Sequence, residues 1–282
     1  MAKESSSSCP SLLTGTCSSN PHVTITCLSL NVADNEYAYL VDLLSDDEKE
    51  RSLRRVPEVR RRAVVSRGRL RVLLGCLIGV APEEVSLTAG HFGKPYLSDP
   101  HQSSIQFNVA HSMDEAVIAL SRQCTIGVDV EKRKTTHDER WARLMAPTIL
   151  SEIEMKKRIG VSHELRPEEV LDCWVAKEAV LKAIGTGIGD KLRACQLPSD
   201  LPEFGMSVDS VISSCRLAPV EFKQQEFFSG NELGVTLIDL GAGSHLAVAC
   251  PAQSCKLAVR SFERVLKTAY QKTDPVGHEA RS

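Results

Sequence analysis

The sequence predicts an α+β protein with two similar halves, each a long helix followed by a small, mostly antiparallel sheet. Two observations carry this prediction. Helical periodicity followed by short alternating apolar stretches occurs twice along the 282 residues. The composition, with 42% hydrophobic and 25% charged residues, is typical of a globular chain with one large domain or two ordinary ones. The halves share this order of elements but no clear residue-level repeat.

Four segments are expected along the chain. Residues 1–20 read as a disordered Ser-rich tail, residues 21–125 as the first half, residues 126–262 as the second half, which contains the candidate metal ligands, and residues 263–282 as a frayed polar tail. The start of the chain shows no secretory signal. Its serines leave a transit peptide open, although residues 1–20 contain Glu4 and no arginine.

The first half begins with a strand over 22–30, because β-branched residues alternate there with other side chains. Ser45 and Glu48 have the spacing of a capping box and predict a helix start, and Pro57 is expected to break that helix. A longer helix over 60–78 follows from its single apolar face. Short strands are then expected over 85–88, 105–110, 115–120 and 125–130, with a turn at 93–95.

The second half starts with predicted helices over 140–145, 151–159 and 168–184. Gly185 is expected to end the last of these helices. Strands are predicted over 221–228, 233–240, 245–250 and 257–262, with a turn at 241–244. No stretch approaches 18 uninterrupted apolar residues, so no membrane-spanning segment is expected.

Net charge and cysteine content limit the class of protein. The chain has 34 Lys and Arg against 36 Asp and Glu, a formal charge of −2, which argues against a generic nucleic-acid coat protein. None of its ten cysteines forms a C-x-x-C pair or has zinc-finger spacing. They are interpreted as small hydrophobic residues in a reducing compartment.

Nine arginines gather between residues 51 and 71, at positions 51, 54, 55, 60, 61, 62, 67, 69 and 71. Most of them fit a solvated helix face. Because arginine makes bidentate contacts with phosphate oxygens, the stretch also fits a phosphate site. Nucleic-acid binding is the weakest of the three interpretations, because no aromatic residue lies between the arginines.

The stretch Ile-Gly-Val-Asp-Val-Glu over 126–131 is the most informative one. On a strand, Asp129 and Glu131 share one face, roughly 7 Å apart, while Val128 and Val130 point into the core. Neighbouring carboxylates favour a nearby cation, and hard oxygen ligands suit Mg²⁺. A solvated strand edge explains the same pattern without a metal, so the pair is not decisive alone.

Two further stretches carry candidate chemistry. In the predicted helix WVAKEAVLK over 174–182, Glu178 and Lys182 share a face, which also fits an ordinary surface ion pair. Lys177 lies about 100° around the same helix and reads alone as a solvated side chain. His111, in the sequence Phe-Asn-Val-Ala-His-Ser, reads alone as a structural histidine.

Taken in order, these stretches closely resemble the Sfp-type 4′-phosphopantetheinyl transferases of the holo-acyl-carrier-protein synthase superfamily. That family's pattern is a Gly-Lys-Pro turn, then F-N-x-S-H-S, G-x-D-x-E and W-x-x-K-E-x-x-x-K. The corresponding sequences here are GKP at 93–95, FNVAHS at 107–112, GVDVE at 127–131 and WVAKEAVLK at 174–182, preceded by EKER at 48–51. The resemblance covers roughly residues 22–262.

This resemblance implies a pseudo-dimer of the two α+β halves, with coenzyme A in the cleft between them. It implies transfer of 4′-phosphopantetheine from coenzyme A to a serine of an apo acyl or peptidyl carrier protein, with release of adenosine 3′,5′-bisphosphate. Such an enzyme is a Mg²⁺-dependent holo-[acyl-carrier-protein] synthase. The Mg²⁺ would neutralise charge on the pyrophosphate and orient the leaving group.

The resemblance also implies roles for individual residues. Asp129, Glu131 and Glu178 would hold Mg²⁺, and Glu178 is also the candidate general base towards the serine hydroxyl. Lys182 would hold the phosphates and stabilise the leaving group, with Lys177 in support. Contacts with coenzyme A are further implied for Arg51, at the 3′-phosphate, and for Gly93, Lys94, Pro95, Asn108 and His111.

Two departures from the family's pattern motivate an alternative. Ala110 stands where the family usually has serine, and Ile149 stands where it often has an acidic residue. Without that acid, activation of the nucleophile would rest on Glu178 alone. The alternative is a catalytically weakened member that binds coenzyme A or a carrier protein without efficient turnover.

The expected partners are coenzyme A and an apo carrier protein, with no nucleic acid and no membrane, and the chain is expected to be a monomer. The carrier is left open between fatty-acid biosynthesis, lysine metabolism, and polyketide or peptide synthetases. Because carrier domains are typically acidic, the Arg-rich region also suits such a partner. The expected location is cytoplasmic, with a mitochondrion or plastid as the alternative.

Overall fold

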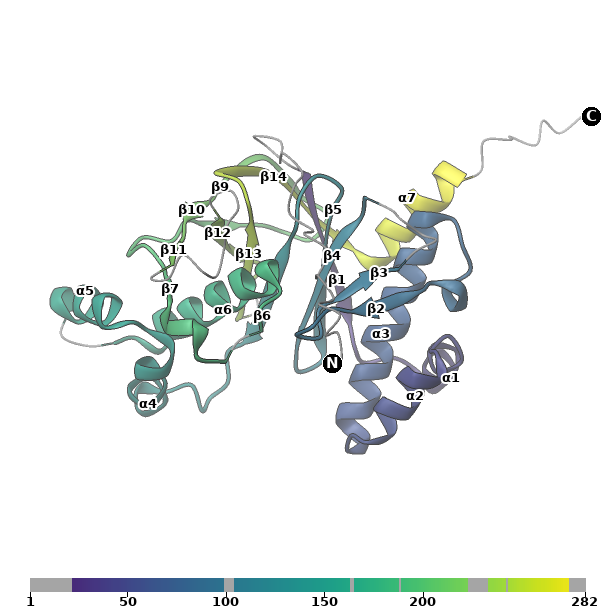
Figure 1. The fold of residues 1–282 in the computed structure, drawn as a ribbon, viewed down its shortest axis with the longest axis horizontal. Coiled ribbons are helices and arrows are strands. Elements are labelled where there is room, and N and C mark those ends of the chain that lie inside the picture. Colours follow the sequence, from purple (N-terminus) through teal and green to yellow (C-terminus); the bar gives the residue numbers. More distant parts are fainter. Residues whose placement is uncertain are drawn as a thin grey trace, which may run out of the picture.

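The computed structural model describes residues 22–98, 104–162, 165–187, 189–222, 233–241 and 243–273. These residues form four layers, in which two sheets pack face to face and helices cover both outer faces (Figure 1). The predicted α+β class with two helix-and-sheet halves is confirmed. The expected Ser-rich tail over 1–20 and most of the strand expected over 221–228 lie outside the described residues.

The first sheet has five strands in the order β4-β5-β1-β14-β9. Their bounds are β1 (His22–Ser29), β4 (Gln106–Ser112), β5 (Glu115–Ser121), β9 (Val211–Arg216) and β14 (Ser254–Ser261). β1 and β14 pair in parallel, whereas the other neighbours pair antiparallel. Because β9 and β14 follow residue 126, this sheet draws strands from both predicted halves, and the halves are intertwined rather than separate.

Four helices lie on the outer side of this sheet. They are α1 (Asp34–Asp42), α2 (Asp46–Leu53), α3 (Pro57–Ile78) and α7 (Phe262–Thr273). The capping box of Ser45 and Glu48 is present at the start of α2, and Pro57 opens α3 as its first residue. The expected polar tail after residue 262 is wrong in its first part, because α7 buries Phe262 against the helix-covered face of the sheet.

The second sheet has the order β10-β12-β13-β6, with β8 pairing in parallel with β12. The bounds are β6 (Gly127–Lys132), β8 (Glu203–Gly205), β10 (Ala218–Pro219), β12 (Gly234–Asp239) and β13 (Ser244–Cys250). Its outer face packs against α4 (Glu139–Ile149) and α6 (Pro167–Ile184). Gly185, at φ 78°, takes the left-handed conformation that ends α6, as predicted.

The remaining elements lie at the ends of these layers. They are α5 (Glu152–Ser162), the 3₁₀ turns Pro82–Glu84 and Gly189–Arg193, the hairpin of β2 (Leu87–Ala89) and β3 (Pro95–Leu97), and the pair of β7 (Cys195–Gln196) and β11 (Glu221–Phe222). Among the described residues no cysteine forms a disulfide, and most cysteines are buried as small apolar side chains. None of the helices in the described ranges is both long and apolar enough to cross a bilayer.

Side chains of β4 join the two sheets at the edge of β6. The side-chain oxygen of Asn108 accepts a hydrogen bond from the backbone N–H of Val128 at 2.9 Å. The hydroxyl of Ser112 accepts one from the N–H of Lys132 at 3.0 Å. The N–H groups of a strand alternate between its two edges, so the N–H of Val130 points towards β4 as well. Ala110 lies between Asn108 and Ser112 on β4, and its methyl side chain has no oxygen that could accept the hydrogen bond of this N–H.

Replacing Ala110 with serine is therefore expected to raise the free energy of unfolding by about 1 kcal/mol, because the new hydroxyl can accept the hydrogen bond of Val130. Chemical denaturation of the two proteins measures the difference. Ser112→Ala is the matched control in the opposite direction, since it removes an acceptor at the same edge. A serine variant that is less stable than the parent would show that this position tolerates only a methyl group.

Candidate active site

The acidic cluster exists because α6 lies unusually close to β6 at Gly127. A Cβ atom added to Gly127 would lie 1.9 Å from the carbonyl oxygen of Ala179 and 2.4 Å from the nitrogen of Ala183. No other residue fits there without moving the helix. This contact explains the glycine of the GVDVE stretch, and it places Glu178 and Lys182 beside Asp129.

The strand places its carboxylates as the alternation predicts. Val128 and Val130 are buried in the core between the two sheets, so Asp129 and Glu131 face the other way, towards the side of α6. Glu131 is fixed from outside its own strand, because the hydroxyl of Ser112 donates to Glu131 Oε2 at 2.7 Å. Ser112 therefore accepts a hydrogen bond from the edge of β6 and also orients one carboxylate of the cluster.

Lys182 bridges two of the carboxylates. Its ammonium is hydrogen-bonded to Asp129 Oδ1 and lies 3.5 Å from Glu178 Oε2. Asp129 is only 4% exposed, and its second oxygen, Oδ2, is buried without a hydrogen-bond partner among the described residues. Burial raises the pKa of Asp129 to about 7, against the opposing charge of Lys182 and with the added repulsion of Glu178. The raised pKa shows that Lys182 alone does not offset the burial of the Asp129 carboxylate and the nearby charge of Glu178.

A pocket of about 310 Å³ opens beside this cluster, between α2, α3 and the ends of β3 and β4. Its polar lining includes Arg51, Arg55, Arg67 and His111. Burial lowers the pKa of His111, and the nearby charge of Lys182 lowers it further. His111 therefore lies where the pocket and the acidic cluster meet. Pro95 and Val109 also line the pocket, so three of the implied coenzyme A residues, Arg51, Pro95 and His111, come together there.

Lys177 does not belong to this site. Its side chain is fully buried, and its ammonium donates to Glu154 Oε2 at 2.7 Å and to the carbonyl oxygens of Ile149 and Leu192, both at 2.9 Å. Every donor of the ammonium is thus used inside the core beneath α6. The role expected for Lys177, support of a phosphate, is corrected to a structural one.

Lys94 and Asn108, which were also expected to contact coenzyme A, form hydrogen bonds inside the protein instead. The ammonium of Lys94 donates to the carbonyl oxygens of Ile126 at 3.0 Å and Ala183 at 3.1 Å, and burial lowers its pKa to about 8. Lys94 therefore attaches the β2–β3 hairpin to the end of α6. Gly93, at φ 82°, forms the turn that permits this. The amide of Asn108 is used at the edge of β6, and neither Lys94 nor Asn108 is among the described residues lining the pocket.

Sequence reasoning did not single out Arg55 and Arg67, which line the pocket, or Ser112, which holds Glu131. Both arginines belong to the Arg-rich stretch 51–71, and no local pattern separates them from its other arginines. Ser112 follows Asn108 and Ala110 at period two, which places all three on the same face of β4.

Comparison with known proteins identifies the family of this chain. A family model described as the 4′-phosphopantetheinyl transferase superfamily matches residues 125–210, and one described as the N-terminal part of 4′-phosphopantetheinyl transferases matches residues 31–123. The 4′-phosphopantetheinyl transferase HetI of Nostoc sp. is 33% identical over 163 residues, which cover 57% of this chain and 68% of HetI. This chain belongs to the 4′-phosphopantetheinyl transferase family.

Other relatives extend the match. A protein of Synechocystis sp. is 33% identical over 171 residues, covering 60% of this chain and 68% of its own length. The human L-aminoadipate-semialdehyde dehydrogenase-phosphopantetheinyl transferase is 27% identical over 192 residues, which cover 64% of this chain and 60% of the human protein. The family transfers the 4′-phosphopantetheine group to carrier proteins, with coenzyme A as the donor. In this transferase, the acidic cluster and the arginine-lined pocket lie side by side.

Proposed function

We propose that this chain acts as a Mg²⁺-dependent holo-[acyl-carrier-protein] synthase, with coenzyme A bound between the arginine-lined pocket and the acidic cluster. One observation carries the proposal. Within the described part of the chain, a buried carboxylate oxygen of Asp129 has no hydrogen-bond partner, and it lies in a cluster of three carboxylates that adjoins an arginine-lined pocket. A cation at the carboxylates and phosphates in the pocket would satisfy both groups.

The residues present fit a magnesium ion. Asp129, Glu131 and Glu178 supply the hard oxygen donors that Mg²⁺ prefers, and the unpartnered Oδ2 of Asp129 is a donor in need of a cation. Within the described ranges, no group of three or more His, Cys, Asp or Glu side chains has its ligand atoms close enough together to hold a metal ion in this conformation. Lys182 bridges Asp129 and Glu178 instead. When bound, the ion would neutralise charge on the pyrophosphate of coenzyme A.

The chain's own side chains can carry the proton and the negative charge of the reaction. The serine oxygen of the carrier attacks the phosphorus that bears pantetheine, and the bond from that phosphorus to the adenosine bisphosphate breaks. Burial raises the pKa of Glu178, which makes it a better acceptor for the serine proton, although Lys182 opposes the shift. Lys182, one helical turn further on, would stabilise the bisphosphate as it leaves.

Incubation with apo carrier proteins, coenzyme A and Mg²⁺ tests this function. The carrier is expected to gain the mass of the phosphopantetheine group, and omission of the metal, with a chelator present, is expected to stop the gain. Carriers from fatty-acid biosynthesis, from lysine metabolism and from peptide synthetases, assayed in parallel, would identify the substrate. Absence of any mass gain with all three classes would overturn the proposal.

The alternative is a member that binds coenzyme A or a carrier without efficient turnover. Two observations favour it: Ile149 is fully buried at the end of α4 and offers no carboxylate, and Ala110 leaves one position of the β6 edge uncapped. Calorimetry that shows tight coenzyme A binding, together with no transfer to any carrier, would select this alternative.

A proton is expected to be taken up when coenzyme A binds. In the free protein, burial and the charge of Lys182 hold the pKa of His111 below its ordinary value. A phosphate beside the imidazole favours the charged form and raises that pKa. Affinity should therefore increase as the pH falls through the interval between the two pKa values. Calorimetry in buffers of different ionisation enthalpy measures the uptake, which His111→Phe is expected to abolish.

The state and location of the protein remain predictions. We propose a monomer located in the cytoplasm, with an organelle as the alternative. Size-exclusion chromatography with light scattering tests the first point, and localisation of the tagged full chain tests the second.

A further inference from the structure

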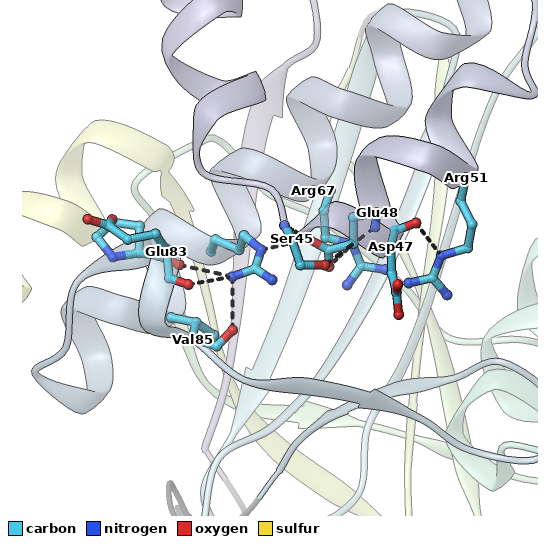
Figure 2. Close-up of polar contacts among 9 residues, drawn as sticks. Ser45, Asp47, Glu48, Arg51, Arg67, Glu83 and Val85 are labelled. Atoms are coloured by element: carbon cyan, nitrogen blue, oxygen red, sulfur yellow. Dashed lines mark hydrogen bonds and ion pairs between the residues drawn. The ribbon is translucent and has the colours of Figure 1, made fainter.

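A single buried carboxylate, Glu48, organises the arginines next to the pocket (Figure 2). Glu48 belongs to α2 and is 9% exposed. Its Oε2 accepts the backbone N–H of Ser45 at 3.0 Å in the capping box and the Nε–H of Arg71 at 2.8 Å. Its other oxygen, Oε1, lies 3.5 Å from Nε of Arg67. One carboxylate is thus shared by two arginines of α3 that lie one helical turn apart.

Arg71 is held inside the protein through its Nε and NH1. Its guanidinium is buried, and NH1 donates to the carbonyl oxygens of Pro82 at 3.1 Å and Val85 at 2.9 Å. Together with the bond to Glu48, these contacts fix the position of the carboxylate. The charge of Arg71 also offsets that of Glu48, so the carboxylate does not by itself make the pocket repel anions.

Arg67 and Arg51 are held in a different way from Arg71. Arg51 donates its Nε–H to the carbonyl oxygen of Asp47 at 3.2 Å, and Arg67 forms an ion pair with Glu48, with Nε at 3.5 Å from Oε1. The terminal amino groups of both arginines have no partner in the part of the chain that the structure describes, and both side chains line the pocket. Each arginine is therefore oriented by one nitrogen and keeps two nitrogens for a ligand, the arrangement suited to bidentate phosphate binding.

We propose that Arg67 binds the 3′-phosphate of coenzyme A together with Arg51, and that Glu48 is the positioning residue that aims Arg67 at it. The inference rests on the proposed function. It goes beyond the role implied for Arg51, because it adds a second phosphate ligand and the carboxylate on which that ligand depends. The pyrophosphate must lie at Lys182 and the carboxylates, where its bond is broken. This leaves the 3′-phosphate, a monoester dianion, for the two guanidinium groups.

The role of Glu48 can be separated from its charge. If Glu48 acted only through its charge, Glu48→Gln would remove a negative group near an anion site and strengthen coenzyme A binding. If Glu48 positions Arg67, the same change releases Arg67 and leaves it beside the like charge of Arg71, so binding weakens. The two hypotheses predict opposite signs.

Calorimetry with coenzyme A and with 3′-dephospho-coenzyme A tests the inference on the full chain. Arg67→Met is expected to weaken coenzyme A binding by roughly tenfold to hundredfold, since a charge-assisted contact is lost, while binding of the dephospho ligand changes by less than about twofold. Glu48→Gln is expected to weaken coenzyme A binding in the same selective way. The double variant should resemble Arg67→Met, because Glu48 acts through Arg67. Glu50→Gln, in an exposed ion pair with Arg54 on the same helix, is the matched control and should leave both affinities unchanged.

Several results would overturn the inference alone. These are tighter or unchanged coenzyme A binding by folded Glu48→Gln, equal losses for both ligands in Arg67→Met, or a parent protein that binds the two ligands equally well. A parent that binds neither ligand would instead overturn the proposed function. If Glu48→Gln does not fold, Glu48→Asp replaces it, because the shorter side chain keeps the charge but withdraws it from Arg67, and the same selective loss is expected.

Discussion

Replacing Glu178 with glutamine is expected to lower the rate of phosphopantetheine transfer by about 10²- to 10⁴-fold, the contribution typical of a positioned general base. The amide has nearly the same shape but cannot accept the serine proton. It also removes one negative charge from the group formed with Asp129 and Lys182, so the protein should remain folded. Mass spectrometry of the carrier over time measures the rate.

The control for this variant must separate chemistry from folding. Glu50→Gln makes the same chemical change at an exposed position of α2 and should transfer at the parent rate. The circular dichroism and melting temperature of Glu178→Gln should match those of the parent. Transfer at the parent rate by Glu178→Gln would show that another group takes the proton.

Replacing Lys177 with methionine is expected to lower the free energy of unfolding by about 3–5 kcal/mol, the usual result of removing one partner of a buried ion pair. The change leaves Glu154 buried without its cation and deprives the carbonyl oxygens of Ile149 and Leu192 of their donor. Chemical denaturation measures the loss. Arg54→Gln, which breaks an exposed pair at the C-terminal end of α2, should cost less than about 1 kcal/mol.

The double variant Glu154→Leu with Lys177→Met tests whether the buried ion pair can be replaced by apolar side chains. Replacing both partners of a buried ion pair by apolar residues is often harmless. Here Glu154 also accepts the backbone N–H of Ser151 at 2.7 Å and of Leu197 at 2.8 Å, and both would lose their acceptor. The double variant should therefore stay destabilised. Recovery of the parent stability would show that these two amide bonds contribute little.

The sequence predicted local features of the site well, because they depend on residues close in the chain. Alternation along the strand placed Asp129 and Glu131 on the face opposite to the buried valines. The spacing of Ser45 and Glu48 predicted the capping box at the start of α2. Helical spacing correctly paired Glu178 with Lys182. Each of these follows from the period of a strand or a helix.

Features that depend on distant packing could not be read in the same way. Lys177 and Glu178 are neighbours on one helix, and only the packing of α4 and of residues near Leu192 decides that Lys177 is buried. The side chain of Lys94 is directed by carbonyl oxygens of Ile126 and Ala183, which belong to other elements. Likewise, nothing local to residues 254–261 indicates that they pair with β1.

The pairing of β1 with β14 has a consequence for how the chain folds as it is made. His22 lies opposite Lys256, so this edge of β1 stays uncovered until β14 has been synthesised more than 200 residues later. Until then β1 has one unpaired edge, which can join strands of other chains. Contacts of such high sequence separation slow folding and prolong exposure to aggregation. A nascent chain that stops before residue 254 should therefore need chaperone protection, whereas a chain that includes β14 can cover this edge of its own sheet.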